Sequence, residues 1–364
     1  MKKPYMPKEL PLKALPWSSF IRLIGKANAA IARYDCILQG IINPDVLLSP
    51  LTTQEAVLSS RIEGTQATIE EVLAFEAAPE IKTARYEDIQ EIINYRKAMH
   101  LAIEELHKRP ISLNMLLNMH SVLLDSVRGH NKGRGRFRTV QNWIGAPGTP
   151  VESATFIPPE PQHLMEHLSS LEKYIHYDEE DRLVQLAIIH AQFEMIHPFV
   201  DGNGRLGRIL VPLFLYEKGL LGSPMFYISS YLEENRTAYY DKLRGISDNN
   251  DWSGWIRFFL TAVIEQAKNN SEKAKAILAL YERMKTEVAR LTRSQFSIQA
   301  LDELFSRPVF KTTDFARRTG ISMASAKRIL NSLKNNHILA QVRPGKGKHA
   351  AILMFKELID IVEK

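Results

Sequence analysis

Twelve residues near the middle of the chain, from His197 to Arg208, bring together side chains suited to handling phosphate. The run reads H-P-F-V-D-G-N-G-R-L-G-R and contains an imidazole, a carboxylate, a glycine-rich turn and two arginines. An imidazole titrates near neutral pH and can act as a general base. A carboxylate can hold a divalent cation that bridges phosphate oxygens, and arginines neutralise those oxygens. The run therefore predicts a phosphate-handling site in one loop.

Two helices are expected to position this loop. Residues 181–196 carry apolar side chains at helical spacing and contain no Gly or Pro, which predicts a largely buried helix. Pro198 ends that helix, so His197 lies at its end with packed residues behind it. The second helix is expected from about residue 205 to residue 219, with an internal proline that bends it.

The turn between the two helices, residues 201–204, reads D-G-N-G. Glycines around an asparagine tolerate positive φ and let backbone N–H groups converge on an anion. Arg205 and Arg208 share a face of the following first helical turn, where the helix dipole disfavours cations unless something negative binds there. Taken one at a time, these residues could be a capping His, a plain turn and a solvated Arg pair. Their order in a single run favours a polyphosphate site.

The run matches every specified position of H-x-F-x-D-G-N-G-R-x-x-R, so the chain resembles the Fic family. The resemblance implies a helical core that moves AMP from ATP to a Ser, Thr or Tyr hydroxyl of a target protein, with loss of pyrophosphate. It implies His197 as the catalytic base and Asp201 as the ligand of Mg²⁺. The nucleotide-binding residues that it implies in this run are Asp201, Gly202, Asn203, Gly204, Arg205, Leu206, Gly207 and Arg208.

Three further features refine this resemblance. The family's kinase-like branch has Lys where this chain has Gly204, so Gly204 favours nucleotidyl transfer. Residues 133–161 are rich in Gly and Pro and predict a β-hairpin that resembles the family's flap, an ordinary surface loop being the alternative. Asn235 and Tyr239 fall in the region that contacts adenine and ribose in the family, a packing role being the alternative. The flap residues expected to pair with the target as an added strand are Ser153, Ala154, Thr155 and Phe156.

A second motif lies far upstream. Residues 53–64 predict a short helix, with Thr52 or Thr53 as its N-cap and a glycine at its end. The end of this helix reads S-x-x-x-E-G, a pattern that is weak by itself. Its specified residues are Ser59, Glu63 and Gly64.

Beside the Fic signature, this pattern resembles the family's inhibitory motif, whose glutamate pairs with the second arginine of the signature. A buried, bidentate pair between Glu63 and Arg208 would remove the partner of the γ-phosphate, so ATP would bind in a posture that does not react. In some relatives the same glutamate serves the reverse reaction, so removal of AMP by this chain stays open.

Composition and length set broad limits on the protein. The chain has 364 residues, 45% hydrophobic and 24% charged, which fits a soluble globular protein of two or three domains. It lacks an apolar run of about eighteen residues and the layout of a signal peptide, so no membrane association is expected. The single Cys36 cannot form an internal disulfide. A cytoplasmic protein is the simplest expectation.

The expected organisation is mainly α-helical with four parts. They are an N-terminal helical region at 1–105, a catalytic core at 106–270, a connecting helix at 271–300 and a winged-helix-like domain at 301–364. From Phe305 onward the chain carries twelve Lys or Arg and four Asp or Glu, which sets the last part apart from the rest.

The last part resembles a winged helix-turn-helix. Residues 311–333 predict two helices around a turn at Gly320, with Ser322 as a cap, and residues 338–355 predict a hairpin. DNA would bind within residues 305–348, with the second helix in the major groove and the lysine-bearing wing on the phosphates. Docking of another protein or of a second copy of the chain is the alternative. Two functions therefore stay in view: an autoinhibited adenylyltransferase, with self-modification open, and a DNA-binding regulator that senses nucleotide. The candidate DNA contacts are Ser325, Lys327 and Arg328.

Overall fold

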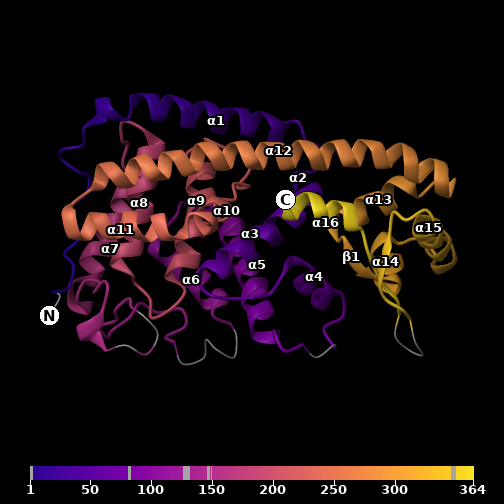
Figure 1. Cartoon of the computed structure of the whole chain (residues 1–364), viewed down its shortest axis with the longest axis horizontal. Coiled ribbons are helices and arrows are strands. Elements are labelled where there is room, and N and C mark those ends of the chain that lie inside the picture. The colour runs from indigo at the N-terminus through magenta and orange to yellow at the C-terminus, as the bar shows by residue number, and fades with distance from the viewer. Residues whose placement is uncertain (1–2, 81–82, 126–131, 146–147, 149, 346–349) are drawn as a thin grey trace.

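The chain is mainly helical, as its sequence predicts, with one small sheet near the C-terminus (Figure 1). The structure, a computed structural model, describes residues 3–80, 83–125, 132–145, 148, 150–345 and 350–364. In these residues no helix is long and apolar enough to cross a membrane.

The helices that precede the signature loop form the N-terminal part and one side of the core. They are α1 (Ile21–Gln39), α2 (Pro44–Leu47), α3 (Ser49–Ile62), α4 (Ile69–Ala77), α5 (Tyr86–Leu106), α6 (Leu113–Leu123) and α7 (Leu164–Ile175). The helices that flank and follow the loop are α8 (Arg182–Ile196), α9 (Asn203–Glu217), α10 (Ser229–Glu234), α11 (Arg236–Asn249) and α12 (Trp252–Thr292). Short 3₁₀ helices lie at Trp17–Ser19, Val151–Ser153 and Pro161–His163.

Helix α12 joins the core to the C-terminal unit. Its 41 residues extend over about 60 Å at 1.5 Å per residue, and it packs along α1 before it reaches the last elements of the chain (Figure 1). Of the predicted connecting helix at 271–300, residues 271–292 form the second half of this longer helix and residues 297–300 begin α13 (Ser297–Ser306), so a boundary after residue 270 falls inside α12. No Pro occurs between residues 252 and 292, and the helix ends only at Arg293, which has φ 45°.

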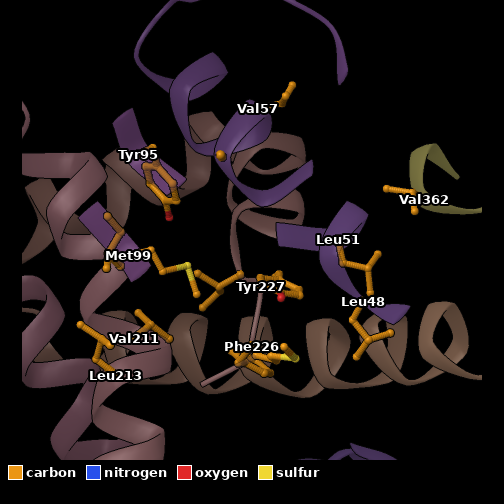
Figure 2. Close-up of a cluster of buried hydrophobic side chains, with 14 of the residues drawn as sticks. Leu48, Leu51, Val57, Tyr95, Met99, Val211, Leu213, Phe226, Tyr227 and Val362 are labelled. Carbon is orange, nitrogen blue, oxygen red and sulfur yellow. The ribbon is translucent and has the colours of Figure 1, made fainter. Parts of the chain in front are cut away.

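Helix α3 lies at the centre of the fold. Twelve of its fourteen residues are buried, and Figure 2 shows Leu51 of α3 near Tyr227 of the segment before α10, with side chains of α5 and α9 beyond it. A helix that is enclosed on all sides needs partners for its polar groups. Glu55 accepts hydrogen bonds from the backbone N–H and the hydroxyl of Ser229 at 3.1 and 2.6 Å.

The predicted start of this helix is wrong. Helix α3 begins at Ser49, four residues earlier than expected, and Thr52 and Thr53 are buried inside it rather than capping it. Pro50 explains the difference, because its fixed φ and missing N–H suit the first turn of a helix.

The C-terminal unit combines helices and a three-stranded antiparallel sheet with strand order β1-β3-β2. Its elements are α13 (Ser297–Ser306), β1 (Val309–Lys311), α14 (Thr312–Thr319), α15 (Met323–Asn335), β2 (Ala340–Arg343), β3 (Ile352–Met354) and α16 (Lys356–Glu363). The predicted turn at Gly320 has φ 65°, and the Ser322 hydroxyl caps α15 by accepting from the Ser325 N–H. Strand β1 and helix α16 were not expected from the sequence, and the tip of the hairpin, 346–349, lies outside the described residues.

Candidate active site

The signature loop connects α8 to α9. The predicted helix over 181–196 is confirmed: α8 spans Arg182–Ile196, and the Asp181 carboxylate caps it by accepting from two backbone N–H groups. His197 ends the helix in the left-handed conformation, with φ 49°. This conformation is costly for a residue with a Cβ and persists only where the surroundings enforce it. Pro198 follows and cannot continue the helix.

The second helix begins two residues earlier than expected. Helix α9 starts at Asn203, so Asn203 and Gly204 lie in its first turn, and only Gly202 provides the positive φ, 83°. The Asn203 side chain closes the loop because its amide accepts from the N–H of Phe199 and donates to the carbonyl of Phe199, both at 2.9 Å. The loop is thus a rigid turn that aims the N-terminus of α9 at the site.

The hydrogen bonds of His197 define its tautomer. Nδ1 lies 3.2 Å from the carbonyl oxygen of Glu194, which can only accept, so in the neutral ring Nδ1 carries the proton and Nε2 keeps its lone pair. Burial lowers the pKa of His197 below its usual value of about 6.5, against the opposing effects of the Glu194 carbonyl and the Glu63 charge. A neutral imidazole with a free Nε2 is the state that a general base requires.

Arg138 and His120, which the sequence motifs do not include, form hydrogen bonds with the backbone of the signature loop. Arg138 donates from Nε to the carbonyl of His197 at 2.9 Å, and its own backbone N–H donates to Pro198. His120 is fully buried, accepts from the Gly135 N–H through Nδ1 at 2.9 Å, and lies 3.1 Å from the Asp201 carbonyl through Nε2. Burial lowers the pKa of His120 to about 4, so its ring is neutral and rigidly bonded at neutral pH.

The acid and the first arginine of the loop are engaged with other side chains. Asp201 forms an ion pair with Lys132 and lies 3.3 Å from Arg205, whose other terminal nitrogen donates to Glu91 at 3.0 Å. Burial alone would raise the pKa of Asp201, but the charges of Arg205 and Lys132 outweigh it and lower the pKa below its ordinary value. Asp201 is therefore ionised at neutral pH. Sequence patterns give no sign of Lys132 or Glu91, because both come from distant segments.

The second arginine is buried against α3. Arg208 is 1% exposed, and it donates from Nε to the Ser59 hydroxyl at 2.8 Å and from one terminal nitrogen to the Ser59 carbonyl at 2.9 Å. The same nitrogen donates to Glu63 Oε1 at 2.6 Å. Ser59 and Glu63 of the upstream motif thus contact Arg208 of the signature, about 145 positions later in the chain.

The geometry of this pair differs from the expected buried, bidentate one. Glu63 contributes a single oxygen, to the terminal nitrogen that also donates to the Ser59 carbonyl, and its side chain is 34% exposed. Burial acts to raise the pKa of Glu63, but the Arg208 charge and hydrogen bond lower it below its usual value. Glu63 is thus a charged, partly exposed carboxylate in contact with the Arg208 guanidinium, which Ser59 also holds.

Two glycines of the run from His197 to Arg208 make room for carboxylates. A Cβ on Gly204 would lie 2.3 Å from Glu63 Oε1, and a Cβ on Gly207 would lie 2.4 Å from Glu194 Oε1. Both distances are far inside van der Waals contact, so any side chain would displace the acids. Gly204 is therefore needed for the contact between Glu63 and Arg208. Burial raises the pKa of Glu194, the acid beside Gly207, to about 8, which leaves its carboxyl protonated at neutral pH.

The predicted flap is less regular than a hairpin. In its described residues, Ile144 and Phe156 form one antiparallel bridge, and the Thr155 N–H also donates to the Ile144 carbonyl at 2.8 Å. Ser153 ends a 3₁₀ helix and Ala154 is buried, so the expected strand edge over 153–156 is wrong for these two residues. Pro150 explains this locally, because a fixed φ at the entry of the segment favours a tight turn. Residues 146, 147 and 149 of the flap lie outside the described residues.

Asn235 and Tyr239, the two residues expected near adenine, differ in how deeply they are buried. Asn235 is half-buried between α10 and α11, and its amide donates back to the Tyr231 carbonyl at 2.9 Å. Tyr239 is 1% exposed, and its hydroxyl lies 2.9 Å from Nε2 of the buried His190. The neighbouring Tyr240 is 43% exposed, and its pKa is raised first by burial and then by Glu63. Tyr240, which no sequence motif indicates, is the tyrosine of this pair that faces outward beside the Glu63–Arg208 contact.

The site fits Mg²⁺ only as a partner of bound phosphate. Among the described residues, no three His, Cys, Asp or Glu side chains come together as a metal site. Mg²⁺ in nucleotide sites is commonly held by one or two carboxylates plus phosphate oxygens, and Asp201 offers one ionised, partly exposed carboxylate. Such an ion would screen the charge of the phosphates beside Asp201.

The site combines a base at the end of one helix with the N-terminus of a second helix and two arginines. A helix N-terminus with arginines beside it is typical of anion-binding sites. The sequence matches the Fic/DOC family N-terminal domain over residues 21–104 and the Fic/DOC family over residues 110–215. The chain belongs to the Fic family, so the resemblance inferred from the signature is confirmed.

Curated relatives are similar over part of the chain. A protein adenylyltransferase of Caenorhabditis elegans is 28% identical over 151 residues, 41% of this chain and 26% of the relative. A probable protein adenylyltransferase of Aquifex aeolicus is 26% identical over 194 residues, 52% of this chain and 56% of the relative. The chain thus spans between about a quarter and somewhat more than half of the length of these relatives.

Solved structures show the same fold. A Fic family protein from Desulfovibrio desulfuricans G20 has 20% identity and a TM-score of 0.60, over 96% of this chain and 98% of that one. A segment of Fic-1 from C. elegans has 20% identity and a TM-score of 0.55, over 70% of this chain and 72% of that one. The first similarity extends over the C-terminal unit as well as the core.

Proposed function

We propose that this chain transfers AMP from ATP to a hydroxyl group of a protein and that Glu63 restrains the reaction. The observation that carries the proposal is His197 with an unprotonated Nε2 in the same loop as a helix N-terminus and two arginines. Two relatives, a protein adenylyltransferase and a probable protein adenylyltransferase, support the same activity.

The chemistry follows from these positions. Nε2 of His197 takes the proton of the target hydroxyl while the hydroxyl oxygen attacks the α-phosphorus of ATP. The bond from that phosphorus to the bridging oxygen breaks, and pyrophosphate leaves with the electron pair. The N–H groups at the start of α9 stabilise the negative oxygens, and Arg205 and Arg208 bind the departing phosphates. Asp201 would hold Mg²⁺, which supplies further charge neutralisation when bound.

Restraint by Glu63 is a competition for one cation. The Arg208 nitrogen that donates to Glu63 is not available to a γ-phosphate, and an incoming phosphate meets the Glu63 carboxylate at the same point. The partial exposure of Glu63 supports this competition, because the carboxylate is within reach of a ligand. Removal of AMP by water that Glu63 orients uses the same position, and we propose it as a secondary activity.

The position of the label in ATP tests the reaction class. With the Glu63→Gly chain and a protein mixture, we expect label from the α-phosphate to become bound to protein, the chain itself included. Label from the γ-phosphate should remain in solution, because it leaves as pyrophosphate. Protein-bound γ-label would instead mean phosphoryl transfer and would refute the proposal.

A second candidate function rests on the exposed face of α15. Lys327 and Arg328 are exposed there, and no acidic side chain occurs between residues 322 and 335. A helix with this face, ahead of an antiparallel strand pair, is the arrangement by which winged helices read DNA. We expect a DNA-binding chain to lose affinity for duplex DNA steeply as salt rises, with a further loss in Lys327→Ala. No binding at low salt would exclude this function.

A further inference from the structure

A cavity of about 200 Å³ lies at the junction between the N-terminal helices and the C-terminal unit. The first turn of α3, beginning at Ser49, forms one wall, while α4, α5, α14 and the segment from α13 to β1 form the others. The cavity lies at the end of α3 opposite to Glu63 along the helix axis. Its titratable lining residues are Glu76, Arg96, His100, Arg307 and Arg318.

The lining has an excess of hydrogen-bond donors and positive charge. Three arginines and one carboxylate line the cavity, and that carboxylate, Glu76, already accepts from Arg96 at 2.8 Å, while Glu303, outside the lining, pairs with Arg318. The Nε of Arg96 is buried and has no hydrogen-bond partner among the described residues. An unsatisfied buried donor of a charged group is costly, so this atom indicates a missing acceptor.

The start of α3 also favours a negatively charged ligand in this cavity. This helix has no side-chain N-cap, because Leu48 precedes it. Pro50 has no N–H, and the N–H groups of Leu51 and Thr52 donate to the Leu48 carbonyl, so this wall contributes the positive end of the helix dipole, which favours an anion. Arg318 pairs with Glu303 at 3.4 Å, a contact long enough to yield to a stronger acceptor.

We propose that this cavity binds a small phosphoryl oxyanion, held by Arg96, Arg307 and Arg318 at the N-terminus of α3. Bound there, the anion links α3 to α5 and to the C-terminal unit. Helix α3 is continuous from this wall to Ser59 and Glu63, a length of about 20 Å for its 14 residues. The anion therefore stabilises the placement of α3 in which Glu63 contacts Arg208.

Calorimetric titration of the full-length chain with inorganic phosphate in chloride buffer tests the site. We expect uptake at one site, weakened by about tenfold or more in Arg318→Ala and in Arg307→Ala, since each loses a charge-assisted contact. The matched control is Arg317→Ala, which removes the neighbouring arginine of α14, a 73% exposed side chain that pairs with Asp314 outside the cavity. This control should bind phosphate like the parent.

Three results would contradict binding in this cavity. Absence of uptake by the parent, or equal weakening by Arg317→Ala and Arg318→Ala, would overturn the proposal. Uptake that none of these variants changes would also overturn it, because the anion would then lie in the signature loop. Unfolding temperatures of all variants check that each one is folded.

The regulatory consequence rests on the proposed AMP transfer and is measured separately. Phosphate should slow self-modification by the parent and leave the Glu63→Gly chain unaffected, because that chain has no inhibitory contact to stabilise. If no AMP transfer is found at all, the calorimetric result still decides whether the site exists. Equal slowing of both chains would place the effect in the nucleotide loop and refute the coupling.

Discussion

Replacing Glu63 with glycine is expected to raise AMP transfer about 10- to 100-fold, the range that corresponds to losing one charge-assisted hydrogen bond. In the parent, Glu63 Oε1 lies 2.6 Å from the Arg208 guanidinium, and both a Cβ-free Gly204 and the two acceptors of Ser59 keep the pair in place. Without the carboxylate, Arg208 keeps its Ser59 contacts but becomes available to the γ-phosphate. Incorporation of α-labelled ATP into protein measures the effect.

Two further variants make this result specific to the Glu63 contact. Glu63→Ala should behave like Glu63→Gly, which shows that added backbone freedom next to Gly64 is not the cause. Glu70→Ala removes an exposed glutamate from the first turn of α4 and should leave transfer at the level of the parent. Equal transfer by the parent and both Glu63 variants would exclude inhibition by this residue.

Replacing His197 with alanine in the Glu63→Gly background is expected to lower transfer by roughly 10²- to 10⁴-fold, the usual contribution of a general base. Nε2 is the atom that is free to take the proton, because Nδ1 is committed to the Glu194 carbonyl. The phosphate contacts come from α9 and the arginines rather than from the imidazole. Calorimetry should therefore show that the variant still binds ATP while the transfer rate collapses.

The pH dependence of transfer reports the same group. Because burial lowers the pKa of His197, the imidazole stays neutral as pH falls through 6.5, and the rate should decline only below that value. The matched control is His163→Ala, which removes an exposed histidine of the 3₁₀ helix at 161–163 and should change neither rate nor profile. Transfer by His197→Ala within tenfold of its background would rule out this histidine as the base.

Local parts of the fold could be predicted because they depend on neighbours in the chain. Helix α8, its end before Pro198 and the turn at Gly202 follow from residues within a few positions of each other, and so do Gly320 and the Ser322 cap. The start of α3 was mispredicted because two threonines look like caps in isolation. Burial by the surrounding helices decided instead, together with Pro50.

The flap and the connecting helix also differ from the structure that local sequence patterns predict. One bridge between Ile144 and Phe156 replaces a regular hairpin, since a segment rich in Pro and Gly offers few ladder hydrogen bonds. Helix α12 continues through the expected boundary at residue 270, because its apolar residues find partners in both the core and the C-terminal unit.

The sequence by itself determined the family, the helical class and the loop that presents His197, because twelve consecutive residues carry that chemistry in a fixed order. The resemblance to the family predicted the pair between Arg208 and Glu63, which lie 145 positions apart. Only the tertiary structure decided the other pairs of the loop: Arg205 meets Glu91 across 114 positions, and Asp201 meets Lys132 across 69. Such pairs depend on how helices pack, and side chains far apart in sequence carry no local signal of the partner that burial will give them.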